Sequence, residues 1–377
     1  MKIVIFCHSL VSDWNHGNAH FLRGICSELI ERGHDVHVHE PRDGWSRTNL
    51  VAQHDDEPLA EFARAFPHLR SSDYVLDRLD LDHVLEGAGL VVVHEWNAPE
   101  LVRRVGAHRA CTGAYLLLFH DTHHRAATQP KEMARFDLRH YDGVLAFGEV
   151  TRQIYLERGW SQRAWTWHEA ADTRVFHPLQ SQPHADLVWV GNWGDDERTA
   201  ELREFVFDPA RRLRLTGSVH GVRYPWRGRL RIRMSGLRYG GWVPNHRAPE
   251  LFARHRFTVH VPRRPYVEKL PGIPTIRPFE ALACGIPLIC APWDDAEGLF
   301  RPGQDYLVAR DGNEMRAHMR AVLRDRELAH ELQRNGLERI SARHTCAHRV
   351  DELLAICDDV RSTTATLPSA TATEVPA

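Results

Sequence analysis

The sequence alternates apolar runs of strand length with helical segments, and it does so in two separate series. The first series begins with an apolar run at residues 2–7, continues with large apolar side chains spaced by four at residues 21–29, and reaches a second strand at residues 35–39. Two such strands, joined through a helix by short connections, open a doubly wound parallel sheet. This alternation predicts an α/β fold.

The same alternation continues along most of the chain. Three more strands are predicted in the first series at residues 90–93, 115–119 and 143–147. A second series starts near residue 186, with strands predicted at 187–190, 213–215, 257–261, 287–290 and 306–309. Because 377 residues exceed what one core usually serves, the repeated architecture predicts two lobes.

A polar, proline-containing stretch at residues 176–183 separates the two series and suits a linker between domains. The predicted domains are therefore residues 1–180 and 181–343. A helix is predicted at residues 344–360, and the tail at 361–377, rich in Ser, Thr, Ala and Pro, is expected to be disordered.

Composition limits the partners that such a chain can have. The 48 Lys and Arg nearly balance the 50 Asp and Glu, and the formal net charge of -2 argues against a bulk electrostatic partner such as duplex DNA or an anionic membrane. A basic run at residues 223–238 reads as a solvated helix face, which leaves peripheral membrane contact possible but not indicated. The chain shows no apolar stretch of about 20 residues and no signal peptide, so we expect a cytoplasmic protein.

The cysteines and histidines do not predict a metal site. Seven cysteines are scattered without a C-x-x-C pair, which suits reduced thiols. The 26 histidines include two clusters, at residues 34–39 and 120–124, but no third ligand follows at a typical metal-binding spacing. We interpret them as surface histidines.

Ligands of doubly wound folds bind beyond the carboxyl ends of the parallel strands. The residues expected there are polar and include histidine and arginine. In the first lobe they are His8-Ser9, His94-Glu95 and His120-Asp121; in the second they are Gly191-Asn192, Gly217-Ser218 and Pro262-Arg263-Arg264. If the carboxyl ends of the two sheets face each other, the cleft between them is the predicted site.

The segment 272–285 predicts a helix start that binds an anion. Thr275 is expected to cap the helix, Pro278 falls in its first turn, and Gly285 ends it. Unpaired N–H groups and the positive end of the helix dipole attract phosphate. Arg277 and Glu280, three residues apart, share one helix face. Upstream cations at Arg263, Arg264 and Lys269 are expected to neutralise a diphosphate, and a carboxylate one turn into the helix is expected to accept from ribose hydroxyls.

Residues 277–285, R-P-F-E-A-L-A-C-G, resemble the signature of group-1 glycosyltransferases with the GT-B fold, and are especially similar to the spore-maturation-protein-like branch. Four more segments resemble the family in the same order: residues 15–18, 119–121, 190–193 and 241–244. The similarity extends over about residues 1 to 360. It implies two Rossmann-like domains facing a central cleft, with the donor nucleotide held by the second domain.

The resemblance also implies roles for individual residues. His16 and Gly17 fall in the loop beneath the donor phosphates, and His120 matches an active-site histidine. Asn192 opens the donor lobe, and Val243 falls in the segment around the nucleobase. Two positions depart from the family: Gly272 stands where a glutamate usually meets the donor sugar, and no lysine follows Gly191, so that the nearest cation is Arg198.

These features predict a glycosyltransferase that needs neither metal nor cofactor and transfers a sugar from a UDP- or GDP-linked donor to the hydroxyl of a small molecule or glycan. The candidate bases are His120, oriented by Asp121, and His16 or Asp13. His120 can equally position a donor hydroxyl, and residues 15–18 can equally be a simple helix-entry loop. An epimerase would require paired carboxylates around the sugar, and a dehydrogenase would require G-x-G-x-x-G after the first strand. A non-catalytic nucleotide-sugar-binding module is the remaining alternative.

Overall fold

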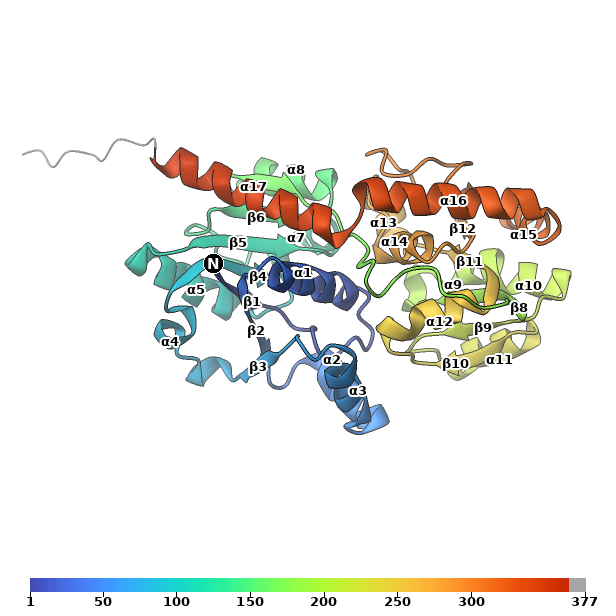
Figure 1. The fold of residues 1–377 in the computed structure, drawn as a ribbon, viewed down its shortest axis with the longest axis horizontal. Helices are drawn as coiled ribbons and strands as arrows, with labels where there is room; N and C mark the ends of the chain where they lie inside the picture. Colours follow the sequence, from blue (N-terminus) through green and yellow to red (C-terminus); the bar gives the residue numbers. More distant parts are fainter. Residues whose placement is uncertain (366–377) are drawn as a thin grey trace, which may run out of the picture.

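The computed structural model describes the backbone of residues 1–365 and shows two α/β lobes, each built on its own parallel sheet (Figure 1). The first sheet has seven strands in the order β3-β2-β1-β4-β5-β6-β7. Its strands are β1 (Lys2–Phe6), β2 (Asp35–Pro41), β3 (Ser71–Tyr74), β4 (Ala88–His94), β5 (Leu116–Asp121), β6 (Gly143–Ala146) and β7 (Ala164–Thr166).

The second sheet repeats this topology with six strands in the order β10-β9-β8-β11-β12-β13. Its strands are β8 (Ala185–Val190), β9 (Gly217–His220), β10 (Arg238–Gly241), β11 (His255–His260), β12 (Leu288–Cys290) and β13 (Leu307–Val308). In each sheet the strand order reverses direction once, between β1 and β4 and between β8 and β11. Such switch points are where doubly wound folds bind ligands.

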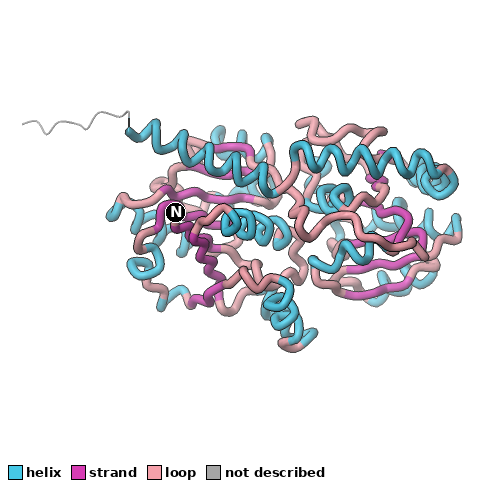
Figure 2. Tube along the Cα trace, viewed as in Figure 1, coloured by secondary structure: helices cyan, strands magenta, loops and turns pink. Residues whose placement is uncertain are grey.

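Helices cover both faces of each sheet (Figure 2). Those of the first lobe are α1 (Ala19–Glu31), α2 (Trp45–His54), α3 (Glu57–Ala65), α4 (Leu81–Leu85), α5 (Pro99–Thr112), α6 (Arg125–Thr128), α7 (Pro130–Met133) and α8 (Glu149–Glu157). Those of the second are α9 (Thr199–Leu202), α10 (Asp208–Leu213), α11 (Trp226–Met234), α12 (Ala248–Ala253), α13 (Arg264–Lys269), α14 (Ile276–Ala283), α15 (Gly312–Arg324) and α16 (Arg326–Arg343). Short 3-10 turns span Leu76–Arg78, Asp195–Glu197 and Asn245–Arg247, and a π-helical turn spans Arg203–Phe207.

Helix α1 forms because its apolar side chains recur every four residues and face the sheet. Phe21, Ile25 and Leu29 are all buried there. The helix ends where Gly33 adopts a φ of +80°, a conformation that costs glycine little. The core that contains α1 continues without a break into α14 of the second lobe, where Phe279 joins it.

The C-terminal helix α17 (Cys346–Ala365) returns to the first lobe and contacts α1 (Figure 1). The indole N–H of Trp167 donates to the carbonyl of Arg349 at 2.8 Å, which fastens this helix to the end of the first sheet. The helix continues five residues past the predicted boundary at 360. The rest of the expected tail, residues 366–377, lies outside the described residues.

The strand predicted at residues 213–215 is wrong. Leu213 is the last residue of α10, Arg214 turns the chain with a φ of +54°, and the strand is β9 (Gly217–His220). Gly217 and Ser218 therefore lie within the strand, and its exit is Gly221. No apolar run in the sequence predicts the edge strands β3, β7 and β10. Each of them pairs with a neighbouring strand on one side only, so it does not require the continuous apolar sequence of a central strand.

Candidate functional site

A pocket lies between the two lobes, at the carboxyl ends of strands from the second sheet. The first lobe contributes the loop after β1, and the second contributes the exits of β8 and β9, the segment after β10, and helices α12 and α14. The lining residues are Asp13, Asn15, His16, Gly17, Val190, Gly191, Asn192, His220, Gly221, Trp242, Val243, Asn245, Ala248, Leu251 and Arg277. Five of the predicted site residues, His16, Gly17, Asn192, Val243 and Arg277, are therefore brought together here.

Gly17 permits the close approach of the N-terminal loop to the start of α14. A Cβ atom at this position would lie 2.8 Å from Cγ2 of Ile276 and 3.9 Å from a terminal nitrogen of Arg277. Any larger residue would push the loop away from the helix. The glycine that the sequence singled out thus allows the two lobes to meet at the pocket.

Asp13 holds the same loop to the second lobe. Its carboxylate accepts from the indole N–H of Trp242 at 3.1 Å and from the backbone N–H of Asn245 at 2.8 Å. Arg23 of α1 donates to it at 2.9 Å. These three donors tie the carboxylate into the junction between the lobes. Asp13 therefore contacts structural partners on both sides of the pocket, which gives it a positioning role that its interpretation as a base did not anticipate.

Glu280 lies fully buried on α14, directly behind the pocket. One oxygen accepts from Nδ1 of His20 at 2.9 Å and from the side-chain amide of Asn245 at 3.0 Å, and the other accepts from Arg277. Although burial alone raises a carboxyl pKa, these partners outweigh it and lower the pKa of Glu280. Arg277 and Glu280, which were predicted to share one helix face, form an ion pair, and Glu280 itself does not line the pocket.

Three arginines of the second lobe lie near one another beside the pocket. Arg198 donates to the carbonyls of Asn192 and Val261, the latter at 3.0 Å. Burial, together with the neighbouring charges of Arg263 and Arg277, lowers its pKa to about 9. Two of the three are ion-paired, Arg263 with Glu197 at 3.4 Å and Arg277 with Glu280, so the cluster keeps a net positive charge, which favours an anionic ligand.

The cations of the basic stretch after β11 lie in different environments. Arg263 lies close enough to His16 and Arg198 for its charge to lower their pKa values, and its guanidinium also pairs with Glu197 at 3.4 Å; it is not one of the residues that line the pocket. Arg264 instead lies on the surface, where it pairs with Glu201 at 2.9 Å. Lys269 is exposed at the end of α13. Only Arg263 of these three cations is therefore placed near the predicted diphosphate.

Thr275 does not cap α14. It occupies the N-cap position, but its side chain makes no capping hydrogen bond, and its hydroxyl lies 3.4 Å from Nε2 of His260. Its φ of +59° is uncommon for a β-branched residue, and such conformations concentrate at functional sites. The first N–H groups of α14 are accordingly left without this cap. Gly285, as predicted, ends the helix in the left-handed conformation.

His120 and Asp121 do not form the predicted pair. They are the last two residues of β5, and successive side chains of a strand point to opposite faces. The Asp121 carboxylate accepts from the hydroxyl of Tyr155 at 2.8 Å and from the backbone N–H of His123 at 3.0 Å. Burial, together with the nearby Glu95, raises its pKa to about 7.

His120 faces the interior of the first lobe. Its ring lies 4.9 Å from that of Trp167 and 5.0 Å from that of His94, and together these three line a small apolar cavity under α1. Burial lowers its pKa well below the usual value, so the imidazole is neutral at pH 7. It does not line the pocket between the lobes.

Comparison with known proteins agrees with this architecture. The family model described as glycosyl transferase-like matches residues 198–355. A search of curated protein sequences finds no match. Sucrose-phosphate synthase from Thermosynechococcus elongatus has a similar structure at 15% identity, with a TM-score of 0.65 over 96% of this chain and 100% of that one.

Two further solved structures are similar. Anabaena Alr3699/HepE, solved in complex with UDP and glucose, is 13% identical, with a TM-score of 0.65 over 95% of this chain and 100% of that one. An alpha-glucosyltransferase in complex with UDP and a 13-mer DNA is 12% identical, with a TM-score of 0.68 over 95% of this chain and 99% of that one. This chain has the GT-B fold.

In this GT-B chain the first lobe presents a group of aromatic and histidine side chains around His16, and the sequence predicted a role in the site for His16 alone among them. His8 and His16 meet through their Nε2 atoms, and the rings of His8 and Trp96 lie 5.6 Å apart. Burial lowers the pKa of His16 to about 3. The sequence contained a signal for this group, because His8 and His94 are polar residues that directly end the apolar runs of β1 and β4.

Glu169 was also missed. It follows β7, lies buried, and accepts from the side-chain amide of Asn18 at 2.7 Å. Burial, together with the charge of Glu280, raises its pKa to about 8. The carboxyl is therefore protonated at neutral pH. No sequence signal marks it, because it belongs to the connection between the lobes and follows a strand of only three residues.

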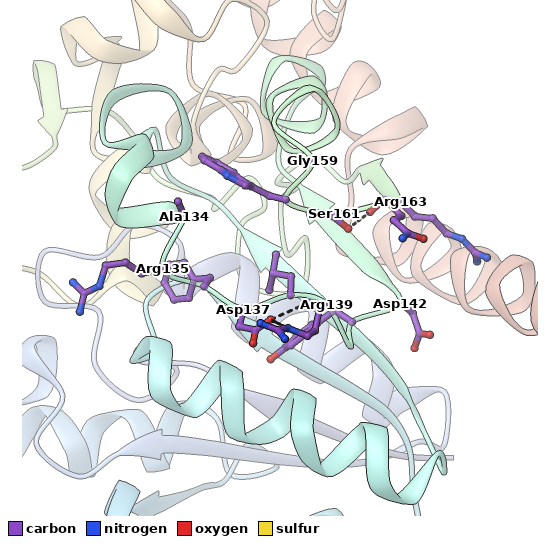
Figure 3. Close-up of a pocket in the computed structure, with 13 residues that line it drawn as sticks. Ala134, Arg135, Asp137, Arg139, Asp142, Gly159, Ser161 and Arg163 are labelled. Atoms are coloured by element: carbon purple, nitrogen blue, oxygen red, sulfur yellow. Dashed lines mark hydrogen bonds and ion pairs between the residues drawn. The ribbon is translucent and has the colours of Figure 1, made fainter.

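A second hollow, on the surface of the first lobe, is separate from the GT-B cleft (Figure 3). Its charged side chains largely neutralise each other: Arg139 pairs with Asp137 at 2.8 Å, and Arg109 reaches Asp142 at 3.6 Å. None of the predicted site residues lines it. The pocket between the lobes therefore remains the candidate site.

Among residues 1–365, no group of three or more His, Cys, Asp or Glu is arranged to hold a metal ion. Within the same residues, no helix combines the length and the apolar character required to cross a bilayer.

Proposed function

We propose that this chain is a group-1 glycosyltransferase that transfers a sugar from a nucleoside diphosphate donor to the hydroxyl of a small-molecule or glycan acceptor. The observation that carries the proposal is the pocket itself. It lies at the switch point of the second Rossmann-like sheet, is closed from the first lobe by the Gly17 loop, and is flanked by three arginines.

The pocket has the parts that a nucleotide requires. Val243, Ala248 and Leu251 supply apolar surface for a base, while Gly191 and Gly221 leave the backbone accessible at the strand exits. At the opposite side, Arg277 and the uncapped start of α14 supply positive charge for phosphate. Glu280 does not itself line the pocket, so its proposed contact with ribose hydroxyls requires that a bound nucleotide reach past Asn245 and Arg277, which do line it.

Departure of a diphosphate requires that its growing negative charge be neutralised. Arg198, Arg263 and Arg277 supply three guanidinium groups for this purpose, so we propose a transfer that does not depend on a divalent ion. His16 lines the pocket, and its Nδ1 has no hydrogen-bond partner among the described residues, which makes it the candidate for accepting the proton of the acceptor hydroxyl. Burial lowers its pKa to about 3, so the imidazole is neutral at pH 7 but weakly basic until a ligand changes its surroundings.

We propose UDP in preference to GDP, since the complexes of Anabaena Alr3699/HepE and of the alpha-glucosyltransferase contain UDP. The similarity of residues 277–285 to the spore-maturation-protein-like branch supports an assignment to that branch. A cytoplasmic location follows from the sequence interpretation alone and stays a proposal.

The test is release of free nucleotide from a panel of UDP- and GDP-linked sugars, followed by mass spectrometry, with and without EDTA. The proposal predicts that at least one UDP-sugar is consumed, that a mixture of glycan and small-molecule acceptors accelerates its consumption, and that EDTA has little effect. Tight nucleotide binding without consumption of any donor would assign the chain to the alternative, a non-catalytic nucleotide-sugar-binding module.

A further inference from the structure

Helix α11 (Trp226–Met234) carries an exposed apolar stripe. Its side chains of Trp226, Leu230 and Met234 are 69%, 47% and 64% exposed. They are spaced by four residues, so they lie in one row along the helix. Of the seven exposed large hydrophobic side chains among the described residues, three belong to this one helix. Single exposed apolar residues are ordinary, whereas a row of three on one face marks a contact surface.

Arginines border this stripe on both sides. With about 100° of rotation per residue, Arg229 and Arg233 fall on one side of the row and Arg227 and Arg231 on the other. All four are exposed. The opposite face of the helix, which contains the buried Gly228 and Ile232, packs against the lobe.

The charge around α11 is strongly one-sided. Residues 209–249 contain ten arginines and no aspartate or glutamate, in a chain whose formal net charge is -2. Within residues 1–365, the four arginines that border the stripe have no carboxylate within 4.0 Å. They make local contacts instead: Arg227 lies over the ring of Trp226 at 5.2 Å, and Arg229 lies over Tyr239 at 5.1 Å. Their charge is therefore available to an external anion.

We infer that α11 docks this protein on an anionic lipid surface. A row of Trp, Leu and Met bordered by arginines is the pattern of a helix that lies in the plane of a membrane interface, with its apolar face shallowly inserted and its cations at the headgroups. A nucleic acid would match the arginines but would leave the apolar row in water. The inference revises the interpretation of this run as a purely solvated face, and it does not depend on the proposed transferase activity.

The position of α11 relates this surface to the pocket. Gly221, which lines the pocket, is followed within five residues by Trp226, the first residue of the helix. The Cβ position of Gly228 lies 3.0 Å from the ring of Trp193, in the loop after β8 that also carries Asn192. Docking through α11 would thus bring the rim of the pocket near the headgroups.

Vesicle flotation tests this inference with the full-length chain. One set of vesicles is phosphatidylcholine alone, and the other contains about a third phosphatidylglycerol. We expect binding to the anionic set only, weakening as salt rises. Two variants separate the contributions: Trp226→Ser/Leu230→Ser/Met234→Ser removes the apolar row, and Arg227→Glu/Arg233→Glu reverses the charge. Each should reduce anionic vesicle binding by at least about tenfold, since each basic residue near the surface contributes about fivefold.

The matched control is Arg320→Glu/Arg334→Glu, which reverses two exposed arginines on α15 and α16. It changes the net charge equally and should bind vesicles within about twofold of wild type. Equal binding by wild type and both α11 variants, or no binding to anionic vesicles, would overturn the inference. Binding to duplex DNA or heparin without binding to vesicles would also overturn it and would assign the arginines to a polyanion. Unchanged circular dichroism and melting temperature establish that the variants are folded.

Discussion

Nδ1 of His20, on the first helix of the first lobe, lies 2.9 Å from a carboxylate oxygen of Glu280, on the second-lobe helix that borders the pocket between the lobes. Nε2 of the same imidazole accepts the backbone N–H of Asp172 at 2.7 Å, so Nδ1 carries the proton and donates it to Glu280. The ring stacks on Phe176 at 3.9 Å. One buried contact thus connects both lobes and the linker between them.

Removing the Glu280 carboxylate should destabilise the protein. Glu280→Ala leaves His20, Asn245 and Arg277 without their common acceptor, and we expect a loss of about 3 kcal/mol or more in the free energy of unfolding. Glu280→Gln keeps an oxygen acceptor and should lose less. Urea unfolding measures both. A double-mutant cycle with His20→Ala should show coupling, and strictly additive effects would contradict the contact.

Nucleotide affinity offers a second, separable readout of Glu280. If the carboxylate also accepts from ribose, Glu280→Gln should weaken binding of both UDP and the intact donor, by about 1.5–3 kcal/mol. The loss is equal for the two ligands because the contact is to ribose. A loss confined to the intact donor would place Glu280 at the sugar instead.

Glu169 should make stability fall as pH rises. Its pKa in the folded state is about 8, above the ordinary value for glutamate, so the folded protein binds more protons than the unfolded chain between about pH 4.5 and pH 8. Stability from this group is complete below that window and is lost across it, at up to about 1.4 kcal/mol per pH unit. Glu169→Gln should remove this dependence. Equal slopes for variant and wild type between pH 5.5 and 8 would refute the assignment.

Variants of His120 and His94 form a matched pair that compares two buried histidines of the first lobe. His120 lines an apolar cavity, and its Nε2 has no hydrogen-bond partner within residues 1–365, so His120→Leu should cost little stability and leave UDP affinity within twofold. His94 bonds the Thr122 hydroxyl at 3.2 Å and lies 2.8 Å from the Glu95 carboxylate. His94→Leu should therefore cost about 1–3 kcal/mol.

Thermal melts and UDP titrations of both variants check this pair. A large loss of sugar transfer in His120→Leu, at unchanged UDP affinity, would instead restore the role that the sequence predicted for His120.

The fold was predictable from the sequence because apolar runs and helical spacing are local signals. Both Rossmann-like sheets, the start of the donor helix after Thr275 and its end at Gly285 followed from them. The site was predictable only where residues act through backbone geometry or lie at a strand exit, as Gly17, Asn192 and Arg277 do.

The other features of the site depend on contacts between segments that are far apart in the sequence. The spacing of residues along the chain does not encode such contacts. The different directions of the neighbours Arg263 and Arg264, the separation of His120 from Asp121, and the burial of Glu169 are set by how the lobes pack together. The strand at residues 217–220 was predicted at residues 213–215 instead, because Leu213 and Leu215 are apolar. In the structure these two residues end a helix and a turn.

The central claim is that the pocket between the lobes binds a nucleoside diphosphate through the arginines of the second lobe. Calorimetric titration of UDP into wild type, Arg263→Ala and Arg264→Ala, all in EDTA, tests it most directly, because these adjacent residues carry the same charge and only Arg263 lies close enough to His16, which lines the pocket, to lower its pKa. We predict that Arg263→Ala loses about tenfold or more in affinity, as expected for one charge-assisted hydrogen bond, while Arg264→Ala stays within twofold of wild type. Equal losses in the two variants, or no UDP binding by wild type unless a divalent ion is added, would contradict the account.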